Sequence, residues 1–242
     1  MNLFNYKNFH ELKPELLRII IINICLGIAY AISAAVSLSI TSLNGGSAIW
    51  LPSGMTLAVF LLRGSEIFPA IAIGSTIGLI SIFYSVESFS HFLFFNVACI
   101  TGNYLQPLLA TFVINRYTNV KALFTSLNGV VIFIISGFLS PMVSAIIKAS
   151  AGVYTKLYSQ ETYWNSFLTM WIASGLTHLI FTPIFLINKI PSIPGLAKIK
   201  PKIKSLIILL VVSLTALVFW LSFIENNSIE YILLLQIGRA HV

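Results

Sequence analysis

Apolar runs of membrane-spanning length follow one another along almost the whole of this 242-residue chain. The hydrocarbon core of a bilayer is about 30 Å thick, so an α-helix needs roughly 20 apolar residues to cross it. Only 9% of the residues are charged, against about 25% in an ordinary soluble domain. The runs predict segments at about 19–40, 50–62, 67–84, 92–114, 130–149, 164–187, 206–224 and from 229 onward. The sequence therefore predicts an all-α, polytopic transmembrane helix bundle.

Basic residues occupy alternate gaps between these runs. If the N-terminus is cytoplasmic, two of the fourteen lie outside, Lys148 and Lys156, and Arg239 lies in the tail. The remaining eleven fall on the cytoplasmic side: Lys7, Lys13, Arg18, Arg63, Arg116, Lys121, Lys189, Lys198, Lys200, Lys202 and Lys204. Cytoplasmic loops carry such an excess of Lys and Arg. We therefore expect a multi-pass protein of the bacterial inner (plasma) membrane with a cytoplasmic segment at 1–18, and no nucleic-acid partner.

The end of the chain predicts that the eighth segment is cut short. The apolar run at 229–236 is far shorter than a membrane span. The following residues, IGRAHV at 237–242, resemble the translation of a sequencing adapter. We therefore expect seven full spans plus a truncated eighth, with a membrane domain at 19–236 and a non-native tail at 237–242. A natural polar C-terminus is the alternative interpretation.

The polar residues form no pattern typical of catalysis or metal binding. The sequence lacks a phosphate-binding glycine-rich loop, paired metal-ligand histidines and a nucleophile elbow. Its seven acidic residues lie outside the apolar runs, and Cys25 and Cys99 lie inside them, where cysteine behaves as a small apolar residue. We therefore expect no enzymatic activity, no cofactor and no metal in this chain.

The second apolar segment opens with WLPSG at 50–54, which is a turn entering a helix. One interpretation is that the backbone carbonyls and the Ser53 hydroxyl line a binding cavity. The other is a helix start, with Trp50 in the aromatic belt at the membrane surface. In the third segment, Ala70, Gly74 and Gly78 are four residues apart, which predicts close approach of another helix.

Polar side chains inside two later segments predict an inward-facing site. Asn96, Asn103 and Gln106 share one face of the segment at 92–114. Trp171 and His178 share a face of the segment at 164–187. Polar groups in lipid need partners, so both faces should point inward, either to hold the helices together or to bind a ligand.

Four stretches, in order along the chain, resemble motifs of the MASE1 family. They are AIWLPSGM at 48–55 with FLLRG at 60–64, FPAIAIG at 68–74, GNYLQP at 102–107, and WIASGL at 171–176 with Thr182-Pro183. The resemblance implies a bacterial membrane sensory domain, usually of eight helices, joined to a cytoplasmic histidine kinase or diguanylate cyclase domain. It also implies that the stimulus is a small molecule or a membrane protein.

We therefore expect this chain to be the sensory input half of a signal-transduction protein, embedded in the lipid bilayer. The output domain then follows the truncated eighth segment, and a homodimer formed through that domain is compatible with this reading. The candidate ligand-binding residues are Trp50, Pro52, Ser53, Gly54, Asn103, Gln106, Trp171 and His178. The alternatives are a small-solute transporter or permease, which the lack of mid-membrane charges disfavours, and a scaffold that binds another membrane protein.

Overall fold

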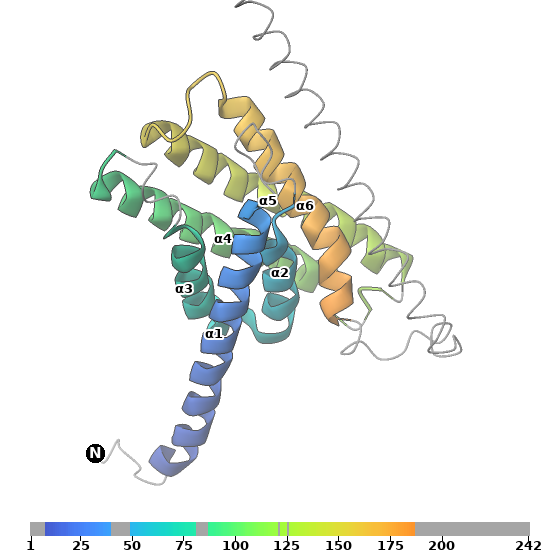
Figure 1. The fold of residues 1–242 in the computed structure, drawn as a ribbon. Helices are drawn as coiled ribbons and strands as arrows, with labels where there is room; N and C mark the ends of the chain where they lie inside the picture. The colour runs from blue at the N-terminus through green and yellow to red at the C-terminus, as the bar shows by residue number, and fades with distance from the viewer. Residues whose placement is uncertain (1–7, 40–48, 81–86, 121, 125, 187–242) are drawn as a thin grey trace, which may run out of the picture. The chain divides into compact units, whose positions relative to one another are not determined.

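The computed structural model describes residues 8–39, 49–80, 87–120, 122–124 and 126–186, and within these ranges every regular element is helical (Figure 1). The elements are α1 (Asn8–Ser39), α2 (Leu51–Arg63), the 3₁₀ helix η1 (Gly64–Ile67), α3 (Phe68–Gly78), α4 (Phe89–Tyr117), α5 (Leu127–Tyr154) and α6 (Tyr163–Leu186). The prediction of an all-α fold is confirmed for these residues.

Local sequence signals set the starts of four helices. A proline lies in the first turn of α2 and of α3. The N–H groups of a first turn have no intrahelical acceptor, so the N–H that proline lacks costs no hydrogen bond there. Serine caps the two long central helices: the Ser88 hydroxyl accepts from the His91 N–H, and the Ser126 hydroxyl accepts from the Gly129 N–H at 3.1 Å.

Helix α2 lies between two groups of helices. Helix α1 packs on α3, and α4 packs on α5, which in turn packs on α6. Helix α2 contacts α1, α4 and α6, so it joins both groups (Figure 1). Trp50, just before α2, packs against the apolar cluster that contains Tyr30, and Gly74 in α3 meets Tyr30 itself. Helices α2 and α3 are joined by η1 and run in opposite directions (Figure 1).

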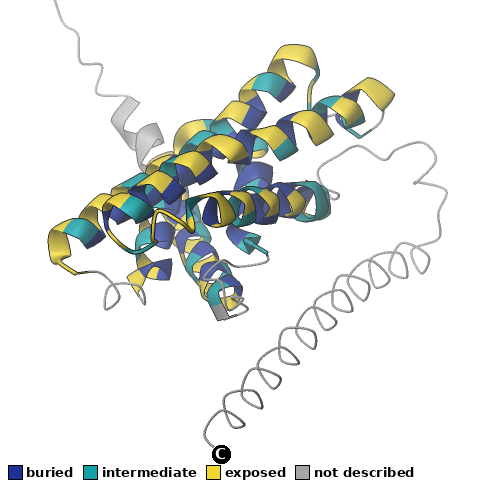
Figure 2. Ribbon diagram, turned by 90° about the horizontal axis from the view of Figure 1, so that it is seen from above, coloured by how far each residue is buried: buried dark blue, intermediate teal, exposed yellow. Residues whose placement is uncertain are grey.

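The bundle has an apolar exterior, and its interior holds many polar side chains among the apolar clusters. Each of the long helices exposes large apolar side chains along its outer side, such as Ile32 at 61% and Phe112 at 68% exposed (Figure 2). Serine, threonine, asparagine and glutamine side chains are buried between the helices. A soluble protein of this size does not expose such continuous apolar surface. This distribution is that of a multi-pass membrane protein.

The predicted count of seven full spans plus a truncated eighth is not supported. Among the described residues, five segments are long and apolar enough to cross a membrane: Glu15–Leu38, Leu51–Gly78, Phe89–Tyr117, Leu127–Tyr154 and Tyr163–Leu186. The second and third predicted spans fall together in Leu51–Gly78, since α2 has 13 residues and α3 has 11. At 1.5 Å per residue these helices are about 20 and 17 Å long, too short to cross alone. The segments predicted at 206–224 and from 229 lie outside the described residues.

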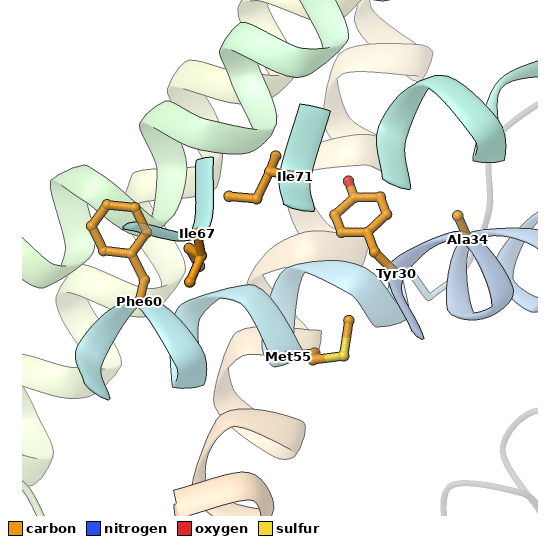
Figure 3. Packing of buried hydrophobic residues seen from close by; sticks show 6 residues of the cluster. All are labelled: Tyr30, Ala34, Met55, Phe60, Ile67 and Ile71. Atoms are coloured by element: carbon orange, nitrogen blue, oxygen red, sulfur yellow. The ribbon is translucent and has the colours of Figure 1, made fainter. Parts of the chain in front are cut away.

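Small residues bring α1 and α3 together, as the sequence predicted. A Cβ atom at Gly74 would lie 2.5 Å from Cβ of Tyr30, and one at Gly78 would lie 2.7 Å from Cβ of Ala34. The main apolar cluster forms around this contact from Tyr30, Ala34, Met55, Phe60, Ile67 and Ile71 (Figure 3). The spacing of Ala70, Gly74 and Gly78 therefore has a packing role.

This contact predicts that Gly74→Ala destabilises the protein by about 1–3 kcal/mol, because the new methyl group overpacks the interface with Tyr30. Gly137→Ala is the matched control, since its Cβ meets no atom closer than 3.6 Å. The measurement is the thermal unfolding midpoint of both variants in detergent. Equal midpoints for the two variants would contradict the packing role.

Candidate functional site

The WLPSG turn docks α2 on α6. The Ser53 hydroxyl donates to the Trp50 carbonyl at 2.8 Å and lies 3.3 Å from the Ser174 carbonyl oxygen. The Thr182 hydroxyl donates to the Gly54 carbonyl at 2.9 Å. A Cβ atom at Gly54 would lie 2.5 Å from the Thr177 carbonyl oxygen, so only glycine permits this approach. Ser53 and Gly54, with buried Pro52 beside them, therefore position the start of α2.

The inward-facing side of α4 is confirmed. Asn96, Asn103 and Gln106 are all buried. The Asn96 amide donates to the Thr76 hydroxyl at 3.1 Å, and the Asn103 amide donates to the Ser75 hydroxyl at 2.9 Å. These bonds join α4 to α3. Within the described part of the chain, the amide oxygens of Asn103 and Gln106 have no hydrogen-bond partner.

Trp171 and His178 on α6 have different environments. The half-buried Trp171 donates its indole N–H to the Phe138 carbonyl at 2.8 Å and packs on the rings of Phe138 and Phe167. Trp171 therefore holds α5 and α6 together. His178 is fully buried, and its Nδ1 lies 2.8 Å from the Gly137 carbonyl oxygen. A carbonyl only accepts, so Nδ1 carries a proton, and the backbone carbonyl of Ser53, a second acceptor, also lies near the ring.

A polar stripe on α5 escaped the sequence analysis. Ser136, Ser140, Ser144 and Lys148 are four residues apart, and all four are buried. The Ser136 hydroxyl bonds the Ile132 carbonyl, but those of Ser140 and Ser144 have no partner in the described ranges. Lys148, expected in an outer loop, lies six residues inside the end of α5, about 9 Å along the helix. The sequence signal for this stripe is a lysine that continues the four-residue spacing of three serines.

Lys148 lies where the helices of the site meet. Its Nζ is 5.7 Å from the centre of the Trp50 ring at the start of α2. It lies near enough to Cys99 on α4 and to His178 on α6 for electrostatic interaction. One turn along α5 from Lys148, Ser144 packs against Gly102 on α4, next to Asn103. We call Trp50, Asn103, Ser144, Lys148 and His178 the Lys148 cluster.

The structure thus divides the eight predicted site residues into two groups. Trp50 and His178 lie near Lys148, whereas Asn103 bonds Ser75 and is next to Gly102, which meets Ser144; Gln106 follows Asn103 on the same face of α4. Pro52, Ser53, Gly54 and Trp171 instead make helix–helix contacts. Among the described residues, no three His, Cys, Asp or Glu side chains are placed to hold a metal ion.

The loops at one end of the bundle are joined by an ion pair. Lys156, after α5, donates to both carboxylate oxygens of Glu87, before α4, at 3.1 Å. Nearby, Tyr158 packs over Gly152. Burial raises the pKa of the Tyr158 phenol, and the neighbouring Cys99 adds to this effect, so the hydroxyl stays protonated. The loops before α4 and after α5 therefore lie at the same end of the bundle.

A comparison with protein-family models matches the MASE1 model over residues 22–237. The chain belongs to the MASE1 family. MASE1 is a family of membrane-associated sensory domains, and the match includes most of α1 and all of α2 to α6. No curated protein and no solved structure matches the chain. The identification from four short motifs is thereby confirmed.

The MASE1-like motifs meet in space. The bond from Thr182 to the Gly54 carbonyl joins the last motif to the first. In the third motif, Gly102 contacts Ser144 closely, while Asn103 and Gln106 face the interior. These motifs therefore position α2, α4 and α6 around the Lys148 cluster.

Proposed function

We propose that this MASE1 domain is the sensory input module of a bacterial signalling protein in the inner membrane. The stimulus binds inside the bundle, and the helices pass the change to a cytoplasmic output domain of histidine kinase or diguanylate cyclase type. The observation that carries the proposal is the Lys148 cluster, where buried polar atoms from several helices converge and several of them lack a partner in the described residues.

Unpartnered buried polar atoms favour ligand binding for an energetic reason. Each costs roughly 1–3 kcal/mol when it is buried without a hydrogen bond. A ligand that supplies these bonds stabilises the arrangement in which the atoms converge. It therefore shifts the bundle toward that arrangement. On this proposal, Trp50, Asn103, Gln106 and His178 contact the ligand, while Pro52, Ser53, Gly54 and Trp171 hold the helices that present them.

The proposed orientation places the N-terminus in the cytoplasm. The eleven-to-two bias of basic residues supports this orientation. The ion pair between Glu87 and Lys156 places the loops before α4 and after α5 at one end of the bundle, and both loops are outside in the proposed orientation. Lys148 lies in the half of α5 nearest these loops. The stimulus then reaches the Lys148 cluster from outside the cell.

This orientation predicts the labelling of single cysteines in a background with Cys25→Ser and Cys99→Ala. A membrane-impermeant maleimide should label Glu161→Cys in intact cells, because that loop is outside. Tyr117→Cys, at a position 72% exposed beyond the opposite end of the bundle, should be labelled only after permeabilisation. Labelling of Tyr117→Cys in intact cells, with Glu161→Cys labelled only after permeabilisation, would contradict the proposed orientation.

The sensory role predicts that Asn103→Leu alters signalling without preventing membrane insertion. The domain is fused to a diguanylate cyclase domain and the cyclic di-GMP level is measured. We expect a change of at least about five-fold, the lower range of measured coupling between sites. Asn96→Leu is the matched control, because both amide atoms of Asn96 already bond Thr76. Unchanged output from Asn103→Leu, with normal insertion, would reduce this residue to a packing role.

One observation favours the alternative of a small-solute transporter or permease. Charged residues inside membrane segments often mark transport pathways, and Lys148 is such a residue. Solute accumulation in proteoliposomes that contain only this protein would favour transport, whereas a change in cyclic di-GMP without accumulation favours sensing.

A further inference from the structure

The Lys148 ammonium group needs a negative partner that the described chain does not provide. A buried charge is costly unless it is paired and hydrogen-bonded. The ion pairs of the described residues both involve Glu87, with His91 and with Lys156. The Trp50 ring, 5.7 Å from Nζ, attracts the cation but does not neutralise it.

Further donors without partners lie beside this charge. The Ser144 hydroxyl is one helical turn from Lys148, and the Ser140 hydroxyl is one turn beyond. The Trp50 indole N–H likewise has no acceptor among the described residues. Charge-assisted hydrogen bonds to an anion are stronger than bonds between neutral groups. An ammonium group with a hydroxyl donor one helical turn away is therefore suited to a carboxylate.

The α4 side of the site presents acceptors instead. The amide oxygens of Asn103 and Gln106 lack partners within the described ranges. An amide oxygen only accepts, so it needs a donor from the ligand. Chloride and simple alkanoates carry no donor for these atoms. The ligand should therefore combine an anionic end with hydroxyl groups.

We infer that the Lys148 cluster binds a small, water-soluble monocarboxylate that carries hydroxyl groups. This inference rests on the proposed sensory function and names its stimulus class. One ammonium group balances one negative charge, so a dianion would leave a buried charge uncompensated. Lys148 is 8% exposed and faces the protein interior, which separates it from lipid headgroups.

The test uses glycerate, a monocarboxylate with two hydroxyl groups, as the probe. Binding to the purified protein is measured by calorimetry in nanodiscs of phosphatidylcholine, which contain no anionic lipid. Glycerate should bind saturably, whereas acetate, glycerol and chloride should bind much more weakly. Lys148→Met should weaken glycerate binding at least about 30-fold, the effect of removing one partner of a buried charge pair. Lys156→Met is the matched control, because it removes an exposed charge outside the cluster and should leave binding unchanged.

A second variant keeps the test valid if Lys148→Met fails to fold. Ser144→Ala should weaken glycerate binding about ten-fold, the effect of one hydrogen bond to a charged group. Equal binding of glycerate and glycerol to the unmodified protein would overturn the inference without any variant. A double variant gives a further test if Lys148→Met does not fold. If adding Glu225→Gln or Glu230→Gln restores folding, that glutamate is the negative partner of Lys148 in the unmodified protein, and the inference is overturned.

The binding and signalling measurements separate the two proposals. If glycerate does not bind but Asn103→Leu still changes the cyclic di-GMP level, the carboxylate inference fails and the sensory function stands. If glycerate binds but neither it nor any variant of the cluster changes the cyclic di-GMP level, the sensory function fails and the binding site stands.

Discussion

The absence of water from the bilayer core is the constraint on which this structure depends. Every polar group placed there must find its partner within the protein. Helices satisfy the backbone, and side-chain bonds between helices satisfy part of the remainder. The bonds from Asn96 to Thr76 and from Asn103 to Ser75 join α3 to α4 in this way. Apolar side chains then cover the outer faces (Figure 2).

Against this background, the Lys148 cluster is the exception that suggests a function. The bundle satisfies Asn96, Ser53 and Trp171 completely, but it leaves several polar atoms around Lys148 without protein partners in the described residues. Natural proteins retain such costly groups mainly where a ligand or a conformational change uses them. Helix α2 meets both groups of helices and begins at this cluster, so it is the element best placed to relay a change in occupancy.

The sequence predicted the features that depend on composition and periodicity. The membrane location, the helical class, the inward face of α4 and the close α1–α3 contact at Gly74 all follow from such patterns. The predicted number of spans is not supported, because its second and third spans correspond to two short helices within Leu51–Gly78. Helices α2 and α3 are each shorter than a bilayer is thick.

The composition of the site was harder to predict because it depends on contacts between distant segments. Trp171 and Ser53 looked like ligand contacts in sequence, but their bonds to Phe138 and Ser174 are helix–helix contacts. Lys148 was placed on the outer side because it falls at the very end of the predicted segment 130–149. Only the continuation of α5 to Tyr154 puts this residue inside the bundle.

An anion-binding site centred on Lys148 inside the bundle can be observed directly. The measurement is a high-resolution experimental structure of the protein in lipid nanodiscs with glycerate present. We expect non-protein density within about 3 Å of the Lys148 Nζ and the Ser144 Oγ, a hydrogen-bonding distance. A Lys148 side chain that extends to lipid headgroups, or pairs with a glutamate of its own chain, would contradict it.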